Sequence, residues 1–463
     1  TIAGSVSTVK AEKMENVPAA SFDQALQGQA PGLMVMSGSG EPSVAASFQI
    51  RGINSLSSGT SPLFILDGVP VSSADFNTLK PSDIESISVL KDGAATALWG
   101  GRGANGVVLI TTKRGMYSKK EIKVVYKFGL GLPVNQPEFA DAYTYAKARN
   151  EALRYDGLQP DMDEASFLAG GNSDLYPNVD WQKEALRNHT TSHQLDITFR
   201  GGGKRLRYFS VLNYKNDMGL LNSKYTDYTD RYNSQMKKYF LNLRMNLDVD
   251  ITDATKLKLN MLGMLRETKR PTTSEATLFE QIFNTPSAAF PVQTQNGLWG
   301  SNNVLKTNPI ANLADVGYYK LNQRMLQADL RLIQDLSVLT RGLSAELAIA
   351  YDNNATYQET AKKSFMYQTI EKGTDGEPVY TNYGNPNDEL EISNKGLANQ
   401  YIHANFEAKV NYHRTWDKHD FTASAMFRQE SMTLTGANNS RYRQYIIGTV
   451  GYNFDNRYIC LLY

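Results

Sequence analysis

Most of this chain alternates between apolar and polar residues with a period of two. In residues 239–249, the odd positions are apolar or aromatic, and the even positions after Phe240 are polar or charged. Residues 402–413 repeat the pattern, with apolar side chains at the even positions and polar ones at the odd positions. Because side chains of a β-strand point to opposite faces in turn, the pattern predicts strands with one apolar and one polar face.

Eleven such strands are predicted, and their connections alternate between short and long. The strands are centred near residues 126, 196, 209, 243, 260, 328, 347, 407, 424, 448 and 460. The short connections are 201–203, 250–254, 337–341, 415–420 and 455–456; the long ones are about 133–190, 215–236, 267–321, 355–398 and 432–440. Short turns on one side and long loops on the other are typical of an outer-membrane β-barrel, with the turns periplasmic and the loops extracellular.

A soluble β-sandwich is the alternative, because its strands also alternate. A sandwich does not explain the regular alternation of short and long connections. It also does not explain charged residues such as Arg244, Asp248, Glu407 and Lys409 along the polar faces of long strands. The pattern therefore favours a barrel.

Residues 1–115 have a different character, with short strands, short helices and many small residues. Helices are predicted near 21–30 and 93–99, and Asp67-Gly68 is a two-residue hairpin signal. The strands are predicted at 5–9, 33–36, 48–51, 63–66, 69–71, 84–90 and 107–112. We therefore expect an α+β domain over 1–115 that sits as a plug in the lumen of a membrane barrel, and barrel strands over 116–463.

The amino-acid composition excludes some classes of function and structure. The net charge is +1, from 48 basic and 47 acidic residues, so the chain lacks the positive excess of a nucleic-acid-binding surface. Cys460 is the single cysteine, which rules out a disulfide within the chain. No apolar run approaches the roughly 18 residues of a spanning helix, but barrel strands of about 9–11 residues score weakly in hydropathy scans. The chain begins at Thr1 and ends within a strand at Tyr463, and we expect it to be an internal fragment.

Five sequence segments of the N-terminal domain resemble those of a known protein family. The matching segments, in order, are 25–33 (ALQGQAPGL), 50–52 (IRG), 63–70 (LFILDGVP), 83–92 (DIESISVLKD) and 102–113 (RGANGVVLITTK). With these segments the chain resembles the SusC/RagA group of TonB-dependent outer-membrane transporters. Three residues differ from those usual in the group: Gly93, where Ala is more frequent, Trp99, where Tyr is usual, and Gly101, where Ser is common.

The resemblance implies a plug inside a barrel of about 22 strands. The eleven predicted strands would then be half of the barrel. An open sheet of this kind would leave unpaired edges in lipid, which is prohibitively costly. We therefore expect the second half of the barrel, and the family's TonB-contacting segment upstream of Thr1, to lie outside this chain.

The resemblance also implies where a ligand would meet the plug. Segments 37–46, 53–62 and 72–79 would form the outer tips of the plug, and their hydroxyl and amide side chains suit a neutral, polyhydroxylated ligand. The alternative is a set of polar turns without ligand contact. The candidate ligand-binding residues are Glu41, Ser57, Ser58, Asp75, Phe76 and Asn77.

Three basic plug residues are candidates for ion pairs with the barrel wall: Arg51, Lys91 and Arg102. In the wider transporter class, the arginine of the Ile-Arg-Gly segment pairs with a barrel carboxylate, and Arg51 matches that position. Glu346 and Glu407 are candidate partners on the inward face. Buried ion pairs would hold the plug until force or ligand loosens them. The alternative is a salt bridge within the plug.

Two other motifs resemble binding sites, for a dinucleotide and for calcium, but lack features that such sites require. Gly101-x-Gly103-x-x-Gly106 matches the dinucleotide-binding spacing, but a helix precedes it and a strand follows, the reverse of the order that binding requires. The acidic turn 161–164 lacks the glycine and distal glutamate of an EF-hand, which leaves a solvated acidic turn or a loop calcium site open.

The histidines and nucleophiles form no recognisable site. His403 and His413 share a strand face but lie about 33 Å apart at ten residues' strand rise, too far for one metal. The other histidines, at 189, 193 and 419, show no tight metal-binding spacing. No Ser-His-Asp or Cys-His arrangement is recognisable, so the sequence predicts no enzyme, no cofactor and no metal site.

Taken with the resemblance, the sequence predicts TonB-dependent import of a large nutrient across the outer membrane of a Gram-negative bacterium. The implied partners are a SusD-like lid lipoprotein, the TonB-ExbB-ExbD complex, outer-membrane lipid and an oligosaccharide, in a dimer of transporter–lid pairs. A peptide importer of the same family and a siderophore or cobalamin receptor without a lid are the transport alternatives. A surface adhesin or signalling receptor is the non-transport alternative, and the plug motifs argue against it.

The first long connection is expected to contain helices, over 141–155 and after 178–181. Helices in an outer loop suit a docking platform or lid contact. They equally suit a long loop that packs only on itself.

Overall fold

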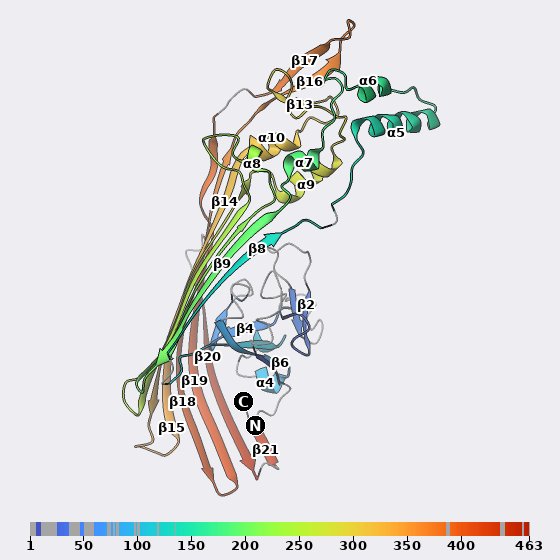
Figure 1. The fold of residues 1–463 in the computed structure, drawn as a ribbon. Coiled ribbons are helices and arrows are strands. Elements are labelled where there is room, and N and C mark those ends of the chain that lie inside the picture. Colours follow the sequence, from blue (N-terminus) through green and yellow to red (C-terminus); the bar gives the residue numbers. More distant parts are fainter. Residues whose placement is uncertain are drawn as a thin grey trace.

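The fold is described from a computed structural model (Figure 1). Within the described part of the chain, no helix is both long and apolar enough to cross a membrane. The structure describes residues 6–10, 26–36, 47–50, 60–71, 76, 79, 83–96, 99, 102–117, 120–134, 136–385, 389–435, 440–455 and 458–462.

A curved sheet of eleven strands runs the length of the molecule, and every neighbouring pair is antiparallel (Figure 1). Its strands follow one another in chain order and match the eleven strands predicted from the alternation. They are β8 (Glu121–Gly131), β9 (Thr190–Gly202), β10 (Leu206–Met218), β11 (Lys237–Asp250), β12 (Thr255–Pro271), β14 (Gly317–Asp335), β15 (Leu343–Lys362), β18 (Glu391–Trp416), β19 (His419–Leu434), β20 (Arg441–Phe454) and β21 (Tyr458–Leu462).

The two faces of this sheet differ as the alternation predicts. On β11, Leu241 and Leu243 are exposed on the outer, lipid-facing side, whereas Asn242, Arg244 and Asn246 are buried on the inner side. The buried polar set faces the N-terminal domain, as its hydrogen bonds show. The sheet therefore presents apolar side chains outward and polar ones to the lumen.

The N-terminal domain lies against the concave side of the sheet (Figure 1). Its core includes three packed aromatic rings, Phe48, Phe64 and Phe76, with centroids 4.5–5.2 Å apart. A five-stranded sheet of order β1-β6-β7-β4-β5 and a two-stranded sheet β2-β3 form this plug. The elements are β1 (Val6–Lys10), β2 (Leu33–Met36), β3 (Ser47–Ile50), β4 (Leu63–Leu66), β5 (Val69–Val71), β6 (Ile84–Leu90), α4 (Gly93–Thr96) and β7 (Val107–Thr112).

The long connections fold together into an outer cap at the far end of the sheet (Figure 1). Its core joins residues from several connections, among them Trp181, Phe290, Trp299 and Ile310. The predicted helices 141–155 and after 178–181 are present as α5 and α7. The cap elements are α5 (Ala142–Tyr155), α6 (Glu164–Ala169), α7 (Trp181–Ala185), α8 (Ser223–Thr226), α9 (Glu275–Asn284), β13 (Trp299–Ser301), α10 (Pro309–Ala314), β16 (Met366–Lys372) and β17 (Pro378–Gly384).

Polar contacts attach the β16–β17 hairpin to the first long connection. The Tyr380 hydroxyl donates to Asp174 Oδ2 at 2.6 Å, and Lys372 Nζ donates to the Tyr176 hydroxyl at 2.7 Å. Partial burial and the hydrogen bond to Asp174 raise the pKa of Tyr380 to about 12. The first connection thus packs against the loop that carries β16 and β17.

We predict that Trp181→Ala loosens the cap and leaves the sheet intact. Trp181 is 3% exposed, packs edge-on against Phe290 and donates from Nε1 to the Pro286 carbonyl at 3.1 Å. Truncation should cost about 3–5 kcal/mol through the cavity it leaves. Limited proteolysis should then cut within 275–314 at a markedly higher rate.

The matched control is Tyr155→Ala, which removes an aromatic ring that is 84% exposed on α5. It should leave the cleavage rate within 275–314 unchanged. Equal cleavage rates for the wild type and Trp181→Ala would show that the loops do not depend on a shared core.

Candidate functional site: the interface between plug and sheet

A buried ion pair joins the plug to the middle of the sheet. Asp83, just before β6, is fully buried, and Arg244 on β11 is 2% exposed. Arg244 Nε lies 3.7 Å from Asp83 Oδ2, and Asn242 Nδ2 donates to the same oxygen at 3.4 Å. Within the described part of the chain, Arg244 Nε and Nη2 have no hydrogen-bond partner. The pair is therefore electrostatic and loosely held, although both charges are out of water.

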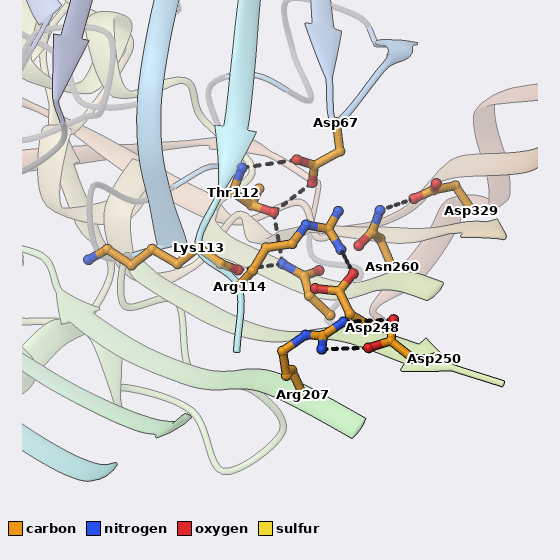
Figure 2. Close-up of polar contacts among 10 residues, drawn as sticks. Asp67, Thr112, Lys113, Arg114, Arg207, Asp248, Asp250, Asn260 and Asp329 are labelled. Carbon is orange, nitrogen blue, oxygen red and sulfur yellow. Dashed lines mark hydrogen bonds and ion pairs between the residues drawn. The ribbon is translucent and has the colours of Figure 1, made fainter. Parts of the chain in front are cut away.

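The end of β7 is anchored to the sheet through Thr112 (Figure 2). The Thr112 hydroxyl donates to Asp67 Oδ2 at 2.6 Å and accepts from Asn246 Nδ2 at 2.8 Å. Asn246 Nδ2 also donates to the Lys113 carbonyl at 2.8 Å. Asp67 has a positive φ of 48° in the hairpin turn predicted at Asp67-Gly68, which places its carboxylate beside β7. A relay of hydrogen bonds thus runs from the plug hairpin to β11.

The chain leaves the plug through a narrow contact with the short-turn end of the sheet. Arg114 Nη1 pairs with Asp248 Oδ1 at 3.0 Å (Figure 2), and the Arg114 carbonyl accepts from Arg200 Nε at 2.7 Å. A Cβ on Gly115 would lie 2.3 Å from the Tyr208 backbone nitrogen. Only glycine allows the backbone of the linker to approach this closely.

A second contact region joins the plug to β18 and β19. Arg102 Nη1 pairs with Glu430 Oε2 at 2.7 Å. The guanidinium of Arg428 lies 4.7 Å from the centre of the Trp99 ring and pairs with Glu407 at 2.6 Å. Trp99 and Arg102 of the plug therefore contact a wall surface of acidic and basic residues.

A small cavity lies between the plug hairpin and the wall, and both apolar and polar side chains line it. Its volume is about 30 Å³, enough for about two waters, and Asp67, Arg244, Asn260, Asp329 and Asp352 are among its lining residues. Asn260 and Asp329 form a hydrogen bond on the wall side (Figure 2). The interface therefore has room for water next to its buried charges.

The structure gives a different result for each of the three basic plug residues that were predicted to pair with the wall. Arg102 makes a contact of the predicted kind, with Glu430. For Lys91 the prediction is wrong, because its Nζ donates to Ser7 Oγ at 2.6 Å and so ties β1 to β6 within the plug. Arg51 lies outside the described residues. Glu346 and Glu407, the suggested wall partners, pair with the wall arginines Arg331 and Arg428.

Most predicted ligand-binding residues fall outside the described part of the chain: Glu41, Ser57, Ser58, Asp75 and Asn77. Phe76 is described, and it corrects the expectation. Its ring is fully buried and stacks on Phe64 at 4.5 Å, so it packs the plug core and offers no surface to a ligand.

The acidic turn of the first connection serves a structural purpose. Arg149 binds Asp161 through two nitrogens, and Asp163 caps α6 by accepting from the Ser166 backbone at 3.2 Å. The Ser166 hydrogen bonds lower the pKa of Asp163. Across the described residues, no group of three or more His, Cys, Asp or Glu side chains could hold a metal ion.

The Asp83–Arg244 pair and the Thr112–Asn246 contact were not predicted from the sequence. Arg244 and Asn246 were correctly placed on the polar face of their strand. Nothing local in the sequence links them to partners more than a hundred residues away. The sequence does show a run of polar residues on one face of this strand, a face that must be buried.

We predict that Asp83→Asn and Arg244→Met each loosen the plug more than the double variant does. Each single change leaves a buried group without its partner and should cost about 3–5 kcal/mol. The measurement is the urea concentration at which proteases cut the plug, with the sheet still folded.

Arg207→Met is the control for that experiment. Arg207 pairs with Asp250 at 2.7 Å within the wall, where both side chains are about a quarter exposed (Figure 2). Such a pair contributes about 0–1 kcal/mol, so the plug should be unaffected. Additive single effects in the double variant would show that Asp83 and Arg244 do not interact.

Comparison with known proteins agrees with the presence of a plug domain beside the sheet. Residues 1–107 match the family of the TonB-dependent receptor plug domain. The chain is 32% identical over 259 residues to TonB-dependent receptor P26 of Formosa agariphila, covering 55% of this chain and 24% of the relative. It is 30% identical over 230 residues to TonB-dependent receptor SusC of Bacteroides thetaiotaomicron, covering 47% of this chain and 21% of the relative.

Among solved structures, the RagAB peptide transporter has the same fold. The TM-score is 0.69 at 19% identity, with 98% of this chain and 54% of the transporter chain covered. The chain thus spans about half of that solved chain and aligns to about a quarter of the curated relatives. These relatives are receptors and a transporter rather than enzymes, as the sequence predicted. Residues 1–107 thus form a TonB-dependent receptor plug domain, and the chain is similar to outer-membrane TonB-dependent receptors of the SusC/RagA group.

Proposed function

We propose that the protein takes part in TonB-dependent import of a large nutrient across the outer membrane. The observation that carries the proposal is the placement of the plug against the polar concave face of the sheet (Figure 1). The described contacts between the two include the ion pairs Asp83–Arg244, Arg114–Asp248 and Arg102–Glu430, together with several hydrogen bonds. Polar contacts of this kind exchange with water at lower cost than a fused hydrophobic core would.

The plug has an edge on which tension can act. β1 is one of the two edge strands of the plug sheet, and among the described residues it pairs with β6 alone, over five residue pairs. Tension applied on the N-terminal side of β1 would act first on this short edge pairing and on the Lys91–Ser7 hydrogen bond. The TonB complex is the proposed source of that tension.

The proposed cargo is an oligosaccharide enclosed with a SusD-like lipoprotein lid. The resemblance of the plug segments to the SusC/RagA group supports the lid and the cargo class, and the cap supplies a folded outer surface on which a lid could rest. A peptide is the second candidate cargo, favoured by the shared fold with the RagAB peptide transporter. Purification of the native complex in mild detergent, with mass spectrometry of bound lipoprotein and ligand, separates the two.

We predict that a covalent link between plug and wall stops import. Thr112→Cys with Asn246→Cys replaces two short side chains that form a 2.8 Å hydrogen bond. Cys460 is exposed and should be replaced by Ser to prevent wrong pairing. Oxidation or a short bis-maleimide should abolish TonB-dependent growth on the nutrient, and reduction should restore growth of the disulfide-linked protein.

The control link is Ser424→Cys with Thr449→Cys, whose hydroxyls lie 2.6 Å apart on adjacent wall strands. This link ties the wall to itself and should leave uptake unchanged. Uptake that survives a complete Thr112–Asn246 link would rule out import by displacement of the plug at this contact.

A further inference from the structure

We infer that the lumen holds an anion-binding subsite beside Arg102, and that the imported ligand carries a carboxylate, sulfate or phosphate group. This inference rests on the proposed import function and names the charge class of its cargo. The subsite is a pocket between the plug and the wall strands β18, β19 and β20. Its lining residues are Arg102, Tyr401, His403, Glu430, Met432, Arg441 and Arg443.

The charges of the pocket do not balance. Three guanidinium groups, from Arg102, Arg441 and Arg443, line it together with one carboxylate, from Glu430. Glu430 already accepts from Arg102 at 2.7 Å. The pocket therefore carries a net charge of +2 with His403 neutral, the sum of three positive groups and one negative group.

Strand register places the two remaining arginines on the lumenal face. Arg443 is directly opposite Glu430, and Arg441 is directly opposite Met432. Directly opposed residues of an antiparallel pair project to the same side of the sheet. Tyr442 between them is 67% exposed on the other face. Arg441 and Arg443 thus project into the same space as Glu430.

The nearby wall supplies no further carboxylate for these arginines. β20 and the connection 435–440 before it contain no Asp or Glu. Glu407, the next acid on the lumenal face of β18, pairs with Arg428 at 2.6 Å. Asp352 lies opposite His403 but lines the neighbouring cavity beside Asp67. Within the described part of the chain, neither Arg441 nor Arg443 has a salt-bridge partner.

The chemistry of the pocket selects oxyanions. A guanidinium presents a planar fork of donors that matches carboxylate, sulfate and phosphate oxygens. Two arginines two residues apart on one strand, with Arg102 facing them from the plug, can surround such a group. Arg441 and Arg443 are exposed, so a ligand in the lumen can reach both guanidinium groups.

The position of the pocket would couple ligand to plug. β20 begins at Arg441, at the end of the sheet that also carries the cap, so an external ligand would reach this pocket from the cap side. A ligand oxyanion that binds Arg102 competes with Glu430 for the same guanidinium. Binding would therefore weaken one of the contacts that hold the plug against the wall.

The test compares a charged and a neutral probe on the receptor purified from the outer membrane. Trigalacturonate and galactotriose are matched in length, and binding is measured by calorimetry at constant ionic strength. We expect trigalacturonate to bind at least tenfold more tightly. Arg441→Gln with Arg443→Gln should weaken it by about ten- to a hundredfold, because each lost charged hydrogen bond is worth about tenfold. Galactotriose binding should not change.

Arg207→Gln is the charge-matched control, since Arg207 lies at the short-turn end of the wall and pairs with Asp250. It should leave trigalacturonate binding unchanged. Equal affinity for both probes, no binding of trigalacturonate, or no effect of the double substitution overturns the anion subsite. TonB-dependent uptake of a neutral cargo would leave the import proposal standing in each of these cases. Binding of the acidic probe without TonB-dependent uptake of any cargo would instead overturn import and leave the subsite.

Discussion

The structure depends on one constraint: polar groups on the inner face of the sheet are removed from bulk water and must find partners in the plug or in one another. Arg244, Asn246 and Asp248 show the constraint on a single strand, where Asp83, Thr112 and Arg114 of the plug meet them in turn. A buried charge without a partner costs several kcal/mol. The plug and the wall are therefore fitted to each other residue by residue.

The same constraint makes the fit reversible. A hydrophobic interface of this length would fuse the two domains, whereas hydrogen bonds and ion pairs have nearly equal alternatives in water. Arg244 illustrates the balance, because its charge is paired at 3.7 Å while part of its donor set is unsatisfied. The cavity beside it offers space for water. The interface is thus stable at rest and poised to hydrate when the plug is displaced.

The sequence was most informative where a structural rule is local and periodic. All eleven strands were predictable because a lipid-facing side and a lumenal side impose a period of two, as in residues 239–249. The hairpin at Asp67-Gly68 was predictable from its turn residues. Arg102 was a candidate because it is a basic residue of the plug, and no local signal identified its partner Glu430, which lies in a distant strand.

Other features had no local signal. The sequence around Phe76 shows no hydrophobic periodicity, so nothing in it distinguishes a core ring from an exposed one. Lys91 was assigned to the wall because its charge was visible and its partner Ser7, on the edge strand, was not. The cap core joins Trp181, Leu221 and Phe290 from three separate connections, and such convergence becomes visible only in three dimensions.

The most direct test of the central claim is whether the polar interface opens during transport. Asn246→Cys, in a protein with Cys460→Ser, places a thiol at a position that is 1% exposed against the plug. Labelling by a membrane-impermeant maleimide from the periplasmic side would be compared in cells with and without TonB. The account predicts slow labelling without TonB and a rise of at least tenfold when TonB and ligand are both present. Equal labelling in both strains would contradict it, because the interface would then stay closed, or stay open, regardless of transport.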